Sequence, residues 1–105
     1  MIKIEFSSSK GLLTGFCLRG HSGYAEQGAD IVCAAVSSAA YMTANTITEI
    51  IGADPEITVD DGIMELKLNK SDAEKARSIM DGFHLHMLGL NEQYSKYITL
   101  KISEV

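Results

Sequence analysis

His21 and Cys33 together have the residue types that carry out nucleophilic catalysis on carbonyl groups. In such catalysis a thiolate attacks the carbonyl carbon, and an imidazole within about 3 Å takes the thiol proton and later protonates the leaving group. The two residues stand twelve positions apart, a spacing that alone does not bring them together. The alternative from residue type is that Cys33 packs in the core and His21 is solvated.

The connection from 20 to 30 is rich in glycine and leads into an apolar helix. Its glycines allow the chain to fold His21 back over the start of that helix. Asp30 is a good N-cap residue, which would make Cys33 the third helical residue. Unpaired backbone N–H groups and the positive end of the helix dipole favour a thiolate there, and the same amides could hold an oxyanion. The sequence therefore predicts a reactive thiol beside a flexible substrate loop that includes Gly20, Gly23, Tyr24 and Gly28.

Two further side chains are candidates for supporting this pair. Asp30 is the nearest carboxylate that could orient the imidazole of His21, although Asp also favours plain capping at that position. Ser37 lies one helical turn beyond Cys33 on the same side of the helix, where an ordinary surface hydroxyl is the alternative. If this loop closes over a substrate, the site is complete only with substrate present, so we expect disorder between Ser22 and Ala29 in the free protein.

The other thiol and the other histidines have simpler interpretations. Cys17 alternates with its apolar neighbours on a predicted strand, which indicates a structural thiol. A redox alternative makes Cys33 a sensor thiol with Cys17 as its resolving partner. His84 and His86 diverge by about 200° on a helix, so they cannot share one ion, and we expect both at the surface. No metal or other cofactor is expected.

Hydrophobic periodicity predicts the elements that position these residues. Alternation in four segments, and a shorter fifth at Ile57 and Val59, predicts strands with one buried and one solvated face. The four buried sets are Ile2, Ile4 and Phe6; Leu12, Phe16 and Leu18; Met64, Leu66 and Leu68; and Ile98, Leu100 and Ile102. A turn at Asp60-Asp61-Gly62 predicts a hairpin over 56–69.

Two segments, 30–51 and 71–88, instead follow the helical period. The predicted buried stripes are Val32, Val36, Ala39, Thr43, Ile47 and Ile50 in the first, and Ala76, Met80, Phe83 and Met87 in the second. Ser71 with Glu74 reads as a capping box, and Gly52 and Gly89 as helix stops. The order ββαββαβ predicts a two-layer α+β sandwich with a mostly antiparallel sheet and two helices.

Composition bounds the class of protein. The chain has 105 residues, a formal charge of −5 and a pI near 5.0, which fits a single domain over 1–105. The acidic balance argues against direct nucleic-acid binding and suits a basic peptide. The first residues lack a secretory apolar stretch, and the run 31–36 is too short to span a bilayer. We therefore expect a cytoplasmic protein with no membrane role and reduced thiols.

Around the candidate pair the chain reads Gly20-His21-Ser22-Gly23-Tyr24-Ala25, then Gly28, then Asp30-Ile31-Val32-Cys33-Ala34-Ala35-Val36-Ser37. This combination of a His motif, a glycine loop and a Cys motif closely resembles the ribosomal-processing cysteine protease family. Length, element order and the closing Tyr94-Ser95-Lys96-Tyr97 segment resemble the family too. The family often has Pro where this chain has Ser95, which lies far from the proposed site.

The resemblance implies a protease that trims the N-terminal extension of large-subunit ribosomal protein twenty-seven, so that ribosome assembly would depend on it. It implies that His21 and Cys33 form the catalytic dyad, that Asp30 and Ser37 support the site or the substrate, and that the glycine loop moves to admit the peptide. The resemblance also implies that substrates are cut after paired aromatic residues. It implies a homodimer and no cofactor. The alternative class is a non-enzymatic ribosome-associated binding module in which the segment 20–30 merely caps the sheet and Cys33 packs.

Overall fold

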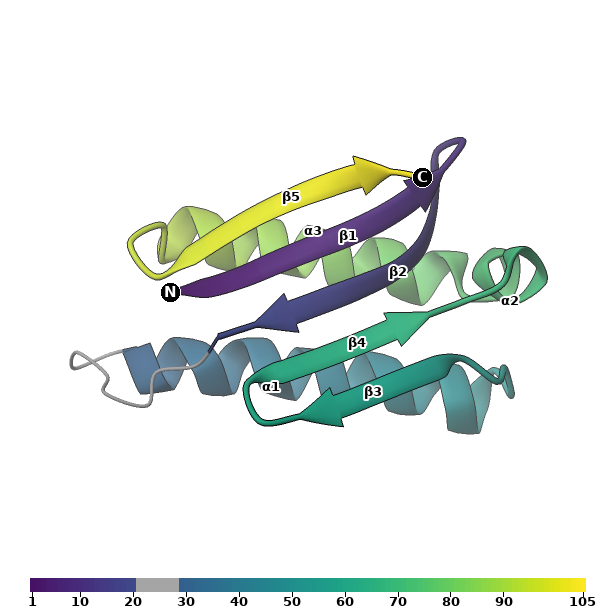
Figure 1. The fold of residues 1–105 in the computed structure, drawn as a ribbon, viewed down its shortest axis with the longest axis horizontal. Helices are drawn as coiled ribbons and strands as arrows, with labels where there is room; N and C mark the ends of the chain where they lie inside the picture. Colours follow the sequence, from purple (N-terminus) through teal and green to yellow (C-terminus); the bar gives the residue numbers. More distant parts are fainter. Residues whose placement is uncertain (21–28) are drawn as a thin grey trace.

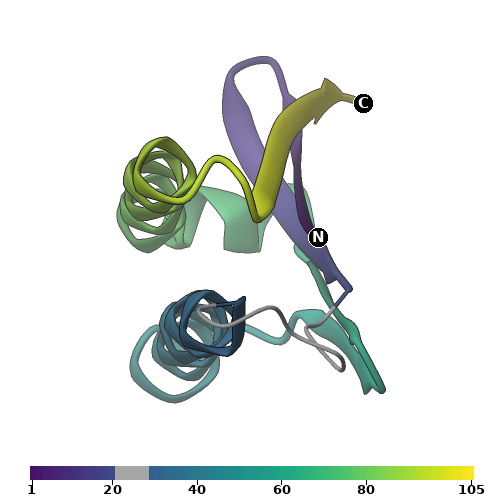
Figure 2. The same ribbon diagram turned by 90° about the vertical axis from the view of Figure 1, so that its left-hand side faces the viewer.

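A computed structural model of the chain describes residues 1–20 and 29–105, and it contains one five-stranded sheet with helices on one face (Figure 1). The strands are β1 (Ile2–Ser9), β2 (Leu12–Arg19), β3 (Glu56–Asp60), β4 (Ile63–Lys67) and β5 (Ile98–Glu104). The helices are α1 (Ala29–Asn45), which runs on into a π-helical turn η1 (Thr46–Ile50), then α2 (Lys70–Lys75) and α3 (Arg77–Gln93). Figure 2 shows the two layers edge-on, with α1 and α3 side by side against the sheet. The predicted two-layer α+β sandwich is confirmed.

The strand order across the sheet is β3-β4-β2-β1-β5. All neighbouring pairs are antiparallel except β1 and β5, which run parallel because α3 carries the chain back across the sheet between β4 and β5. The tight turn between β1 and β2 uses Lys10 (φ 52°) and Gly11 (φ 81°), the positive angles that a two-residue hairpin requires. The edges of the sheet are therefore β3 and β5.

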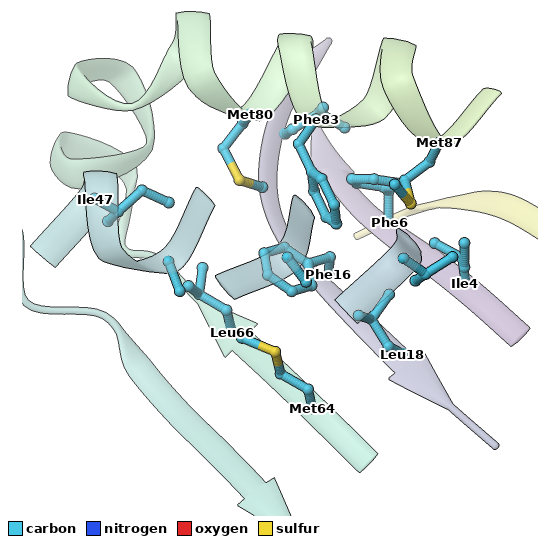
Figure 3. Packing of buried hydrophobic residues seen from close by; sticks show 14 of the residues in the cluster. Ile4, Phe6, Phe16, Leu18, Ile47, Met64, Leu66, Met80, Phe83 and Met87 are labelled. Atoms are coloured by element: carbon cyan, nitrogen blue, oxygen red, sulfur yellow. The ribbon is translucent and has the colours of Figure 1, made fainter. Parts of the chain in front are cut away.

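The core lies between the sheet and the helix layer, where aromatic rings from three elements meet (Figure 3). The ring centroid of Phe83 lies 5.5 Å from that of Phe6 and 4.8 Å from that of Phe16. The predicted stripe of α3 is buried as expected, at Met80, Phe83 and Met87. These contacts hold α3 against β1 and β2, and in the described part of the chain the opposite face of the sheet has no helix (Figure 2).

Several residues predicted as buried lie closer to solvent, including Ile57 and Val59 of β3, which are exposed. Ile50 is 80% exposed because the π-helical turn η1, with Ile51 N–H donating to Thr46 O at 2.9 Å, rotates the chain by less per residue than an α-helix and so shifts Ile50 off the buried stripe. Ile102 is exposed near the end of the edge strand β5. Ala39 is half-buried, and Ala40 takes its place in the core.

The predicted helix over 71–88 is two helices with different ends, so the count of two helices was wrong. The chain leaves helical geometry at Ala76 (φ −95°, ψ 8°) between α2 and α3. Asn69, rather than Ser71, caps α2, since its side chain accepts from Asp72 N–H at 2.8 Å. Helix α3 continues through Gly89, whose cost of about 1 kcal/mol relative to Ala does not end a helix that still packs Leu90 against the core. Gly52, at φ 78°, does follow the end of the first helical segment as predicted.

The α1–η1 segment is unusually apolar for a helix beside solvent. Residues 31–50 are long and apolar enough, by length and composition, to cross a membrane. One face of that helix is buried against the sheet and α3, including Val32, Val36 and Ile47. A core helix passes the same test, and packing explains the hydrophobicity on that face.

Candidate active site

Cys33 is half-buried on α1, where one side of the residue packs against the hydrophobic core. Helix α1 begins at Ala29, so Asp30 lies inside its first turn and Cys33 is the fifth residue rather than the third. Side chains of a helix tilt toward its N-terminus, so the thiol of Cys33 leans toward the first-turn N–H groups, which have no partner within the helix. The thiol is thus placed beside the positive end of the helix dipole and is still within reach of solvent.

A cavity of about 220 Å³ opens beside Cys33. One wall is a single face of α1, because Cys33, Ser37 and Tyr41 follow one another at four-residue spacing. The opposite wall is the β3–β4 hairpin, from Val59 to Met64. The end of β2 at Leu18 and Gly20 closes the cavity between them. A thiol, a hydroxyl and a phenol thus face one hollow.

Gly20 is an ordered junction at the end of β2. Its φ is 90°, and its N–H donates to Gly62 O at 2.8 Å, which ties β2 to the hairpin turn. A Cβ at this position would collide with the carbonyl oxygen of Met1. Only glycine therefore fits here without strain, and this junction fixes where the chain leaves β2 toward His21.

The hairpin turn brings carboxylates to the rim of the cavity. Asp60 and Asp61 both line it, and the side chain of Asp60 accepts the N–H of Asp61 at 2.7 Å. The cavity thus joins apolar walls at Leu18, Val59 and Met64 to an acidic rim. Such a hollow fits an apolar side chain next to a positively charged group.

Comparison with known proteins places the sequence in a family. The sequence model described as cysteine protease Prp matches residues 1–99. The chain belongs to the cysteine protease Prp family. The ribosomal processing cysteine protease Prp of Staphylococcus aureus is 26% identical over 103 residues, which cover 95% of this chain and 97% of that protein.

Solved structures, two of them of Prp, share the fold. The S. aureus protease in complex with a substrate peptide superposes with a TM-score of 0.90 at 24% identity, over 98% of this chain and 100% of that one. The same protease in complex with a covalently linked product peptide gives 0.86 at 25% identity, over the same shares of the two chains. SMU.848 of Streptococcus mutans gives 0.89 at 32% identity, over 100% of this chain and 96% of that one.

The remaining residues predicted for the Prp site are not described by the structure. His21, Gly23, Tyr24 and Gly28, and the predicted disorder between Ser22 and Ala29, lie outside the described residues. The backbone of Asp30 is helical, but its side chain is also outside the description. The roles of these residues in this Prp family member stay predictions.

Sequence reasoning missed the hairpin as part of the site. Tyr41 could have been found, because it continues the spacing of Cys33 and Ser37 by one more turn. Val59, Asp60 and Gly62 could not, because their position beside Cys33 depends on how α1 packs under β4. The turn signal at 60–62 predicted the hairpin but not that the hairpin lies beside α1.

Cys17 lies on the helix-free face of the sheet, away from the Cys33 cavity. It lines a separate hollow of about 370 Å³ with neighbours that include Lys3, Glu5 and Lys101. Burial raises the pKa of the Cys17 thiol, as the nearby carboxylate of Glu65 does to a smaller extent, although Arg19 opposes both. This thiol is held in its neutral form, which agrees with the predicted structural role.

The histidines of α3 differ from each other. His86 is exposed as predicted, but His84 packs edge-on against Phe6 with ring centroids 4.8 Å apart, so its predicted surface position was wrong. Among the described residues, no partner is found for the buried Nε2 of His84. Within 1–20 and 29–105, no three His, Cys, Asp or Glu side chains gather as a metal site would need.

Proposed function

We propose that this chain is a cysteine endopeptidase that removes the N-terminal extension of large-subunit ribosomal protein twenty-seven. The observation that carries the proposal is the half-buried thiol of Cys33 in the wall of an open cavity, in a chain whose family is one of cysteine proteases. Cys33 is the nucleophile and His21 its base. The family's ribosomal processing role supports the substrate.

The chemistry is acyl transfer through a thioester. His21 takes the proton of Cys33, and the thiolate adds to the scissile carbonyl carbon to give an oxyanion that first-turn amides of α1 can hold. His21 then gives its proton to the leaving amine as the C–N bond breaks. Water, activated by the same imidazole, hydrolyses the thioester and restores the thiol. The covalently linked product peptide in the S. aureus relative supports this route, since a thiol nucleophile leaves such a link.

Two side chains support the dyad in this proposal. Ser37 lines the same cavity as Cys33 and can donate a hydrogen bond to a substrate carbonyl there. Asp30 lies in the first turn of α1 and supplies a carboxylate to orient the imidazole of His21. The loop glycines 20, 23 and 28 with Tyr24 admit the peptide.

The protein acts in the cytoplasm as a homodimer in this proposal. Its two cysteines are free, which suits a reducing compartment. The solvent side of α1 carries exposed Ile31 and Met42, and the helix has no charged residue between Asp30 and Glu49, so a second copy could cover it. Sedimentation of the purified chain, beside an Ile31→Glu, Met42→Glu double variant, tests the dimer.

The deciding experiment is incubation of the purified protein with the ribosomal protein that carries its extension, with products read by mass. We expect loss of the extension with the unmodified chain and none with Cys33→Ala or His21→Ala. Cys17→Ala is the matched control, because it removes the thiol on the other face of the sheet, and it should still cleave. A folded protein with a free Cys33 that cuts nothing would refute the protease and leave the binding module.

A further inference from the structure

Strand β3 is an open edge of the sheet. Among residues 1–20 and 29–105 it pairs with β4 on one side only, and all five of its residues are exposed. The two-residue turn makes Asp60↔Ile63 the closing hydrogen-bonded pair, and alternation then assigns Thr58 and Glu56 to the β4 ladder. The backbone N–H and C=O groups of Ile57 and Val59 therefore point away from β4, toward the open edge. An edge with free backbone groups is a template for another strand.

The side chains at these two positions are apolar where edge strands normally carry charge. Ile57 and Val59 are opposite Leu66 and Met64, so they point to the same face as the core and the helices. They are nevertheless 41% and 54% exposed. Exposed Ile and Val side chains on an open edge favour pairing with another chain. Such a chain would cover their apolar surface on the helix side of the sheet.

The same edge leads to the thiol. Val59 lines the cavity that contains Cys33, and Tyr41 lines it from the wall formed by α1. An extended chain laid along β3 would follow Ile57 and Val59 toward the hairpin turn and meet the cavity at that end. Its side chains on the helix side would enter the hollow beside Ser37 and Tyr41, because successive side chains of a strand alternate between faces.

The hairpin and its approach are acidic, which specifies the charge of the occupant. Residues 54–67 contain five carboxylates, at Asp54, Glu56, Asp60, Asp61 and Glu65, and one cation, Lys67, whose ammonium lies 3.8 Å from the carboxylate of Glu65. The negative potential of this hairpin favours the binding of a basic extended chain and speeds its association.

We propose that the open edge of β3 binds the substrate as a sixth strand, and that the occupant is an extended peptide with basic side chains flanking an apolar one. The inference rests on the proposed function and specifies how that function selects its substrate. Main-chain hydrogen bonds to Ile57 and Val59 give affinity and fix the register, and the cavity beside Cys33 takes the apolar side chain. Such a site selects a peptide by its extended conformation and its charge. It tolerates sequence variation at the peptide side chains that point to solvent.

Binding is tested separately from cleavage. The probe is a fluorescent synthetic peptide covering the extension of the ribosomal protein, with its affinity measured by anisotropy on the Cys33→Ala protein. A series of peptides, each methylated at one backbone nitrogen, blocks one donor at a time. We expect a two-residue period, in which methylation at alternate positions weakens binding tenfold or more and the positions between leave it nearly unchanged. Uniform loss or no loss along the series overturns the proposal.

A variant of the protein tests the same contact from the other side. Ile57→Pro removes one donor on the open edge and leaves the β4 ladder intact, since Pro is tolerated where the strand N–H faces solvent. We expect Ile57→Pro to bind the peptide tenfold more weakly than the matched control Ile57→Ala. When Cys33 is present, Ile57→Pro should leave the rate of alkylation of Cys33 unchanged. If the Pro variant does not fold, the methylated peptides decide alone.

Two further results test the charge and the identity of the occupant. Replacing the basic residues of the probe by Glu should weaken binding, and added salt should weaken binding of the basic probe. If Ile57→Pro instead dissociates a dimer with peptide affinity unchanged, the occupant is a second copy and the proposal fails. Failure of the proposed function would appear in the cleavage assay, as no cleavage by the unmodified chain. The anisotropy series would still show whether the peptide binds along β3.

Discussion

Cys17 and Cys33 lie on opposite faces of the same sheet. Cys17 projects from β2 into the hollow on the helix-free face, whereas Cys33 stands on α1 beneath the other face. Phe16 and Leu18, the neighbours of Cys17 in β2, fill the core between them (Figure 3). A disulfide would need the two Cα atoms within about 7 Å, which the intervening layer prevents. The redox alternative, in which Cys17 resolves an oxidised Cys33, is therefore disfavoured by the fold.

The two thiols should differ in reactivity toward iodoacetamide. Alkylation needs the thiolate, and burial raises the pKa of Cys17, so its thiolate fraction near neutral pH is smaller than for an ordinary thiol. We expect Cys33 to be modified at least tenfold faster in the folded protein, with Cys17 catching up only as the pH rises above its raised pKa or in denaturant. Peptide mass spectrometry of timed samples measures both rates. A Cys17–Cys33 disulfide formed under mild oxidant would contradict this arrangement.

Adjacent serines on α1 provide a matched test of the cavity. Ser37 lines it beside Cys33, whereas Ser38 is exposed on the outer side of the helix. If Ser37 binds the substrate or its oxyanion, Ser37→Ala should lower kcat/KM about tenfold, the cost of one hydrogen bond to a charged or reacting group. Ser38→Ala should leave kcat/KM unchanged. Equal effects of the two changes on peptide cleavage would remove Ser37 from the site.

The layers of the fold and the nucleophile region were predictable because both depend on local patterns. Alternation at Ile2, Ile4 and Phe6 and the helical stripe at Met80 and Phe83 report burial directly, and all these residues are buried. The position of Cys33 at a helix start follows from the residues around it. What these patterns share is that the burial of each residue is decided within a few positions of it.

The remaining features depend on contacts between segments far apart in the sequence. The break at Ala76 and the continuation through Gly89 depend on how α2 and α3 pack, which overrides the weak preferences of single residues. The placement of Val59 beside Cys33 depends on the order of strands in the sheet. Periodicity contains no information about which strand becomes an edge, so it assigned Ile57 a buried face that the sheet leaves open.

Glycines in two different settings should respond to alanine with opposite signs. Gly20→Ala places a Cβ at φ 90° against the carbonyl oxygen of Met1, so it should lower the free energy of unfolding by about 2 kcal/mol. Gly82→Ala, in the middle of α3 with no atom near its Cβ, should raise it by up to about 1 kcal/mol. Urea unfolding followed by circular dichroism measures both. A neutral Gly20→Ala would show that the end of β2 is not held as a fixed junction.

Glu104 should make stability depend on acid pH through two hydrogen bonds at the end of β5. Its carboxylate accepts from Lys10 N–H and from the hydroxyl of Ser8, each at 2.8 Å, and these bonds lower the pKa of Glu104 from its ordinary 4.5. A carboxyl group whose pKa is lower in the folded state stabilises the protein above the unfolded pKa and loses that contribution as the pH falls through the folded pKa. Glu104→Gln should therefore lower the urea midpoint near pH 7 and leave it nearly unchanged at a pH below the folded pKa.

Ser8→Ala separates the two bonds of Glu104. It removes the hydroxyl donor and retains the Lys10 N–H, the larger cause of the lowered pKa, so its effect at neutral pH should be smaller than that of Glu104→Gln. The order of midpoints near pH 7 should be unmodified chain, Ser8→Ala, then Glu104→Gln. Because the carboxylate joins the β1–β2 turn to the last strand, equal midpoints for all three proteins across the pH range would mean that this end of the sheet is held by its backbone ladder alone.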